Sequence, residues 1–352
     1  MPRNTPFIAE KNTNYAGKHG MNPKVLVEIV SMKSLVLVWI ILLQAIDGFC
    51  WGFYAHRLIN QQAIFLLPPD MLIFYKPHLA FLTEHAVDPD KRRYAIEEEA
   101  PRHYIDMDHY GTAPYDNLPR KWKEAVDCYT EDSLQVHGIV PWWIQVMLSR
   151  LTIAFREKNQ WRILKLSAEL GHYLADAHVP LHTSSNHNGQ FTNQQGIHGF
   201  WESVIPELLA EKEWDLLLPG AALISDPLGY AWATVLASAA ATDTVLGFES
   251  RLTKKFPPDR KYAYRLRAGQ MLRQYSEAYT IAYDRMMNHM VERKLRHSIS
   301  TVASFWYTAW VNAGQPDLSA MGGKDQDEDQ KKEFDNLNRE WEKGNPRGKS
   351  CG

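Results

Sequence analysis

Most of the chain follows the hydrophobic period of about 3.6 residues that is typical of amphipathic helices. Apolar positions three and four residues apart recur from about residue 56 to about residue 310, and proline, glycine and capping residues divide them into segments. No convincing alternation of apolar and polar residues and no Asn-Gly hairpin appears, so strands are expected to be minor. The pattern therefore predicts an all-α fold, a multi-helix bundle in one domain.

Six segments show the helical period most clearly: residues 56–65, 76–85, 119–125, 141–157, 159–177 and 199–209. Two longer helices follow. Asp226 and Pro227 form an N-cap and first-turn pair, which predicts a helix that continues to about Leu252. Asp259 is expected to cap a further helix, with room for one break, that ends near Trp310.

The two ends of the chain are not expected to belong to this domain. Residues 1–31 are polar and mixed, and we interpret them as upstream sequence outside the mature protein. Residues 32–50 have the features of a signal peptide: a basic residue, an apolar run over 35–43 and small residues before Trp51. The domain is predicted over residues 51–318. Residues 319–352 are charged and poor in apolar residues, which predicts a largely disordered tail.

The apolar run at 35–43 is shorter than the roughly 20 residues that span a bilayer. We therefore expect an exported protein, periplasmic or secreted, with no stable membrane span in the mature chain. The alternative is a signal anchor, or a lipoprotein acylated on Cys50. If Cys50 leaves with the signal peptide, Cys128 and Cys351 remain far apart, and no disulfide is expected.

The composition fits a globular protein, with 45% hydrophobic residues and a formal net charge of −2. No excess of basic residues indicates duplex nucleic acid as an obligatory partner. No feature of the sequence points to an obligatory protein partner either. With so few cysteines, stability is expected to come from the buried core and from metal ions.

Candidate metal ligands concentrate between residues 172 and 202. His172 and Asp176 are four residues apart in a helical segment, so one helix face presents an imidazole and a carboxylate together. A proline ends that helix just before His182, and His198 and Glu202 repeat the spacing of four on the next predicted helix. Three histidines and two carboxylates without cysteine favour zinc or another borderline metal. A closed, purely structural metal site stays open as an alternative.

Two weaker pairs precede this stretch: Trp51 with His56, and Asp88 with His103. In order, the ligand pattern reads Trp-x4-His, Asp-x14-His, His-x3-Asp-x5-His and His-x3-Glu. This order resembles the superfamily of zinc-dependent phospholipases C and single-strand-specific zinc nucleases. The resemblance covers Trp51 to about Glu202 by motif, and it implies an all-α exported phosphodiesterase with a trinuclear zinc cleft.

The resemblance implies nine ligand residues for three zinc ions: Trp51, His56, Asp88, His103, His172, Asp176, His182, His198 and Glu202. Asp176 would bridge two ions. One is held with His56 and with the free α-amine and carbonyl of Trp51, and the other with Asp88, His103 and His172. The last three ligands would hold the third ion, which is more exposed and meets the substrate phosphate.

Asp88 is also the catalytic candidate, as the carboxylate that orients or deprotonates the attacking water. Other nearby acids remain alternatives for this role: Asp90, Asp106 and Asp108. Asp106 is further expected to be a hydrogen-bond partner of a histidine. His178 and His187 fall outside the ligand spacing, and we interpret them as surface or substrate-pocket residues.

The substrate class is left open by two conflicting features. Glu202, together with the short loop between His182 and His198, looks like the phospholipase branch. The tight spacings of Trp51 and His56 and of Asp88 and His103 look like the nuclease branch. The sequence favours a phospholipase C-like hydrolase whose partner is a phosphodiester substrate, with a single-strand nuclease as the alternative. A metal-stabilised binding protein without turnover is the remaining alternative, from a different class.

Overall fold

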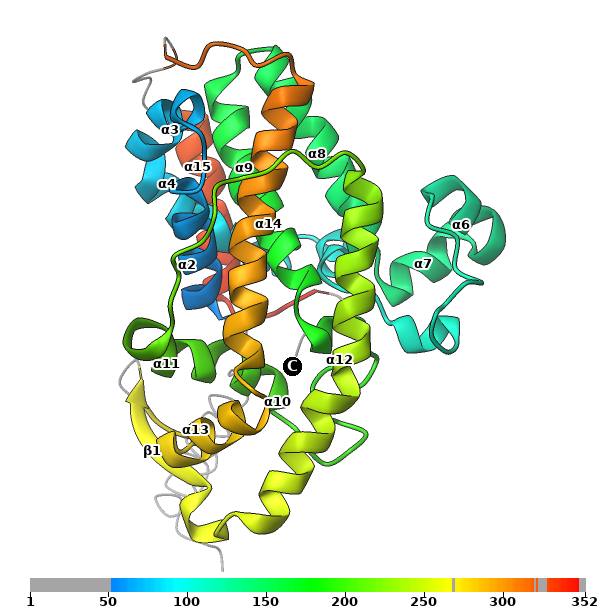
Figure 1. Ribbon diagram of the computed structural model, residues 1–352, viewed down its shortest axis with the longest axis vertical. Coiled ribbons are helices and arrows are strands. Elements are labelled where there is room, and N and C mark those ends of the chain that lie inside the picture. The colour runs from blue at the N-terminus through cyan, green and yellow to red at the C-terminus, as the bar shows by residue number, and fades with distance from the viewer. Residues whose placement is uncertain (1–51, 268–269, 320, 322–327, 348–352) are drawn as a thin grey trace, which may run out of the picture. The chain divides into compact units, whose positions relative to one another are not determined.

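The computed structural model describes residues 52–267, 270–319, 321 and 328–347, all within one compact unit. Apart from one two-stranded hairpin, the regular structure of these residues is helical (Figure 1). The predicted all-α class is therefore confirmed. The predicted signal peptide, the upstream residues and Trp51 lie outside the described residues.

Four helices form the centre of the bundle: α2 (Phe53–Ile64), α8 (Val140–Arg156), α9 (Gln160–Ala177) and α14 (Met290–Asn312). α8 and α9 pack against each other, and α14 contacts the other three. The side chain of Asn159 caps α9 by accepting a hydrogen bond from the Arg162 amide at 3.1 Å. Residues 167–177 of α9 are buried without a break. A helix that is buried on all sides is a core element, so the ligand pair of α9 lies in the interior.

Shorter elements connect and cover this centre. They are α3 (Pro69–Tyr75), η1 (Lys76–His78), α4 (Leu79–Glu84), η2 (His85–Val87), α5 (Asp88–Arg92), η3 (Glu97–His103), η4 (Met107–Tyr110), α6 (Trp122–Tyr129), α7 (Glu131–His137), η5 (Pro180–Thr183), α10 (Ile197–Gly199), the π-helical turn η6 (Phe200–Val204), α11 (Ile205–Glu213), α12 (Pro227–Lys255), η7 (Pro258–Arg260), β1 (Tyr262–Arg267), β2 (Gln270–Tyr275), α13 (Glu277–Met286) and α15 (Glu328–Glu342).

α12 begins where the sequence predicted. The carboxylate of Asp226 accepts a hydrogen bond from the Gly229 amide at 3.0 Å, which caps the first turn. By length and composition, α12 is the one helix within the described ranges that suits a membrane span. This is a weak indication, because core helices pass the same test, and α12 packs against η5, α8 and α9.

The predicted helix from Asp259 to near Trp310, for which one break was expected, is wrong in its first part. β1 and β2 form an antiparallel hairpin in which Tyr262 faces Tyr275, and α13 and α14 follow it. Tyr264, two residues beyond Tyr262, is also exposed. Exposed side chains two residues apart along β1 have the period of a strand. The helical pattern of the longer segments around β1 made this short period hard to recognise in the sequence.

The predicted disordered tail contains a helix, α15, that packs on the bundle. Phe334 of α15 lies against His85 and Trp161, with ring centroids 3.9 and 5.4 Å away. About two turns later on the same face of α15, the ring of Trp341 lies 5.4 Å from the ring of Phe53 at the start of α2. The sequence predicts disorder here because few apolar residues, among them Phe334 and Trp341 seven positions apart, hold α15 against the bundle.

Candidate metal centre

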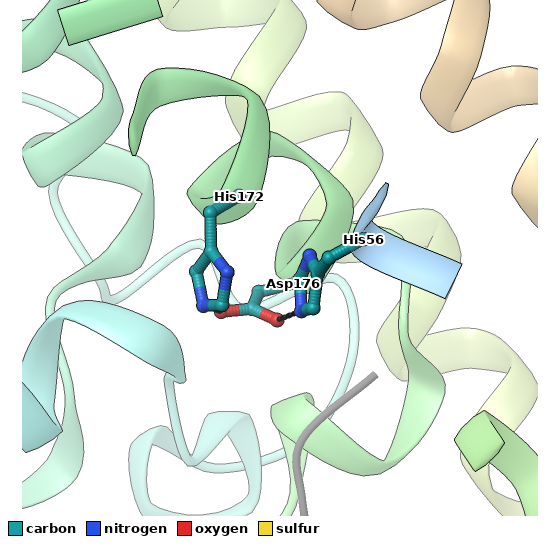
Figure 2. A group of neighbouring side chains, drawn as sticks. All are labelled: His56, His172 and Asp176. Atoms are coloured by element: carbon teal, nitrogen blue, oxygen red, sulfur yellow. Dashed lines mark ion pairs between the residues drawn. The ribbon is translucent and has the colours of Figure 1, made fainter. Parts of the chain in front are cut away.

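Three groups of buried histidine and carboxylate side chains converge in the described part of the chain, each with its ligand atoms within 4.8 Å of one another. They are His56, His172 and Asp176, shown in Figure 2; Asp90, His103 and His172; and His182, His198 and Glu202. His172 belongs to two of the groups, so these two form one continuous site. Every member is at most 4% exposed.

The spacing of four residues on α9 brings His172 and Asp176 together as predicted. His172 Nε2 lies 3.2 Å from Asp176 Oδ2. On its other side, His172 Nδ1 lies 2.8 Å from the carbonyl oxygen of Ala86, to which it must donate a hydrogen bond. Its Nε2 therefore faces the carboxylate. Either a proton on Nε2 or a metal ion between the two atoms satisfies this contact.

Asp176 lies between the groups. Its Oδ2 is 2.9 Å from His103 Nδ1, whereas its Oδ1 is 3.5 Å from His56 Nε2 and 3.8 Å from His182 Nδ1. Figure 2 shows the carboxylate directed toward both His56 and His172. Burial alone would raise the pKa of Asp176, but His172 and His182 outweigh it and hold the pKa well below its usual range. Asp176 is therefore ionised at neutral pH, as a bridging ligand must be.

The third group has the same pattern of ring nitrogens that face a carboxylate. His182 Nδ1 donates to the carbonyl oxygen of His103 at 2.6 Å, and this leaves Nε2 directed at Glu202 Oε1, 3.1 Å away. His198 Nε2 lies 2.7 Å from the same oxygen. The π-helical turn η6 carries Glu202, and His198 precedes it by four residues on α10. The geometry matches the predicted ligand set of this group.

Several buried atoms of these groups have no hydrogen bond to any of the described residues: both ring nitrogens of His56, Asp176 Oδ1, His198 Nδ1 and Glu202 Oε2. An unsatisfied buried polar atom costs about 1–3 kcal/mol, and so many in one place would be strongly destabilising. Burial, reinforced by the positive charge of His172, lowers the pKa of His56 to about 3, so its ring is neutral and able to coordinate a metal. The residues present therefore fit metal ions.

The structure brings Asp90 to the site and not Asp88, which differs from the prediction. Asp90 Oδ1 lies 3.6 Å from His172 Nε2 and 3.8 Å from His103 Nδ1. Asp88 instead accepts a hydrogen bond from His85 Nδ1 at 2.6 Å. In the short helix α5, residues two apart point about 200° away from each other, so only one of the two carboxylates can face the cluster.

Glu99 is a neighbour of the site that the sequence analysis did not identify. Its carboxylate is fully buried, and Oε1 lies 3.5 Å from His103 Nε2. Tyr173 and Arg102 donate hydrogen bonds to it. Burial opposes its charge, but His103 and Arg92 outweigh this effect and lower the pKa of Glu99. An ionised Glu99 orients His103, and the spacing of four residues between them was the available sequence signal.

The remaining candidates lie outside the three groups. Asp106 Oδ2 is 3.7 Å from His137 Nδ1, and Asp108 accepts a hydrogen bond from the Ser185 amide at 3.0 Å. His178 is buried, and His187 is partly buried with its ring 6.0 Å from that of His198.

Trp51 is outside the described residues, but the residue after it lies beside the site. The Gly52 amide donates a hydrogen bond to the carbonyl oxygen of Glu202 at 3.2 Å. The start of the described chain is therefore fixed to the backbone of a metal-ligand candidate.

A search of protein-family models finds no match to this chain, and a search of curated proteins finds no similar protein.

Proposed function

We propose that this protein is a zinc-dependent phosphodiesterase of the phospholipase C type, which hydrolyses P–O ester bonds at a site for three zinc ions. The observation that carries the proposal is the position of Asp176, whose two oxygens face different histidines in a fully buried cluster. Nitrogen and carboxylate ligands without sulfur suit zinc, and closely spaced metal ions are typical of enzymes that cleave phosphodiesters.

The ligand sets follow from the three groups. His56 and Asp176, with the predicted Trp51 terminus, would hold the first ion. The second would be held by Asp90, His103, His172 and Asp176, and the third by His182, His198 and Glu202. When bound, zinc ions supply Lewis-acid chemistry, which activates water as a nucleophile and neutralises phosphate charge.

The protein's own contribution is to hold these ligands ready. The carbonyl oxygens of Ala86 and His103 fix the ring tautomers of His172 and His182, so both Nε2 lone pairs point inward before any substrate arrives. Burial of the ligands keeps the local dielectric low, which strengthens charge stabilisation. Asp90 takes the position that we predicted for Asp88, and its Oδ1 is the acceptor proposed for the proton of the attacking water.

One observation favours the alternative, a single-strand-specific nuclease acting through the same site. Phe191 lies in the loop between His182 and His198, and its side chain is 72% exposed. An exposed aromatic ring on the loop that joins two ligand residues offers a base a stacking surface, worth about 1–3 kcal/mol.

The test is an assay of the zinc-loaded chain that starts at Trp51, against phosphatidylcholine and single-stranded DNA side by side. Release of phosphocholine supports the proposal. Cleavage of DNA alone establishes the nuclease, and Phe191→Ala should then weaken DNA binding about tenfold or more. A folded, zinc-loaded chain that turns over neither substrate would refute both and leave the metal-stabilised binding protein.

A further inference from the structure

A cleft of about 230 Å³ lies between α12, α14 and the end of α9. Its polar lining residues are His178, Tyr230, Thr234, Lys294 and His297, and alanines of α12 complete the wall. His178 follows Asp176 by two residues, which is about 200° around the helix. The cleft therefore opens on the face of α9 opposite to the metal ligands.

The cleft holds a cation without a carboxylate partner. Within the described residues, Lys294 makes one hydrogen bond, from Nζ to Ser238 Oγ at 3.0 Å, and no ion pair. The Ser238 hydroxyl donates its own hydrogen to the carbonyl oxygen of Ala177 at 2.8 Å, so toward Lys294 it is an acceptor only. Two N–H bonds of the Lys294 ammonium group remain for a ligand.

The electrostatic surroundings of Lys294 are positive. Burial and the nearby Arg293 lower the pKa of Lys294 to about 8. The charges that act on His297 are likewise cationic, from Lys294, Arg293 and Arg296. The ring of His297 makes no hydrogen bond or ion pair within the described part of the chain, and no carboxylate lines the cleft. An anion would relieve this accumulation of positive charge.

Two other lining residues, His178 and Tyr230, are joined by a chain of hydrogen bonds through Thr301. His178 Nδ1 donates to the carbonyl oxygen of Leu174 at 2.8 Å, so its Nε2 must accept from Thr301 Oγ1 at 3.3 Å. The Tyr230 hydroxyl then donates to Thr301 Oγ1 at 3.2 Å. Because these side chains already satisfy one another, Lys294 and His297 are the groups left to bind a ligand.

We propose that this cleft binds an oxyanion, either phosphate or a phosphomonoester, which Lys294 and His297 contact directly. The cleft has several times the roughly 30 Å³ that one water molecule occupies, so a phosphate group with a small substituent fits. The proposal does not depend on hydrolysis at the metal centre.

The test is competitive acetylation of the zinc-loaded protein, with the modification of each lysine followed by mass spectrometry. Inorganic phosphate should protect Lys294 saturably, with half-protection at about 1 mM, a typical affinity for one small anion. Lys254, exposed on the same helix α12 that lines the cleft, should not be protected. Sulfate should act like phosphate, whereas acetate should not. Equal protection by acetate would overturn the phosphate class, and no protection by any anion would overturn the site.

Two variants assign the protection to the cleft. His297→Leu should weaken it about tenfold, because the hydrogen bond from the ring to the anion is lost. Lys254→Met, which removes the same charge from an exposed position, should leave it unchanged. Asp176→Asn should also retain it, since the metal centre lies on the other face of α9. Loss of protection in Asp176→Asn would show that phosphate acts through the metal centre, whatever the enzyme's substrate.

Discussion

Replacing Asp176 by Asn tests the central assignment, because it keeps the shape of the side chain and removes its charge. Asp176 has no exposed surface, and its oxygens lie 2.9–3.8 Å from His103, His172, His56 and His182. Losing a group that merely orients a ligand costs about 10–100-fold in metal affinity, so a lost bridging ligand should cost at least about 100-fold. This corresponds to about 2.8 kcal/mol at each of two zinc ions.

The expected result is a folded protein that retains one zinc ion and has no measurable hydrolysis. Metal analysis after dialysis against buffered micromolar zinc measures the content directly. The matched control is Asp284→Asn, which alters a buried carboxylate paired with His289 at 2.7 Å outside the three groups, and it should keep the full content. If folded Asp176→Asn also kept all its zinc, the bridging role would be wrong.

Four further predictions follow from the same structure. Glu202→Gln should deplete only one zinc ion by the same metal analysis, because Glu202 belongs to one group. A chain that retains Cys50 before Trp51 should bind one zinc ion weakly and hydrolyse slowly, since an amide nitrogen is a poor ligand, and proteolytic trimming should restore both. Phe334→Ala should lower the free energy of unfolding by about 3 kcal/mol in urea titrations, and a change below about 1 would mean that α15 adds little stability. Burial opposes the charge of Glu249, but hydrogen bonds from four neighbouring side chains outweigh it and hold the pKa below 4.5. The stability it adds is thus present above pH 4.5 and is lost as the pH falls through the lowered value, so Glu249→Gln should show a shallower loss in acid.

The parts of the site that depend on local spacing were predictable from the sequence. His172 and Asp176, and likewise His198 and Glu202, are four residues apart, and a helix alone is enough to bring each pair together. The cap of α12 at Asp226 is local in the same way. These features need no knowledge of how the helices pack.

The parts that depend on packing between distant segments were not predictable. The choice of Asp90 over Asp88 is made by the rotation of α5 against α9, which the spacing to His103 does not encode. The docking of α15 depends on aromatic partners far along the chain, such as Trp161 for Phe334. A charged segment with few apolar residues is predicted to be disordered, because the sequence alone does not show which partners its aromatic residues will contact.

The π-helical turn η6 lies in one continuous helical segment that must meet two requirements: its first part directs ligand side chains into the metal centre, and its second part packs an apolar face on the core. His198 lies just before the turn and Glu202 within it, whereas the buried face of α11, which includes Ile205 and Leu208, follows it. Each residue advances an α-helix by about 100°, so deleting one residue from this turn would rotate α11 by that angle relative to the ligand pair. Either the apolar face would leave the core or Glu202 would leave the cluster. Individual side chains along this segment can therefore be substituted, whereas the number of its residues cannot change.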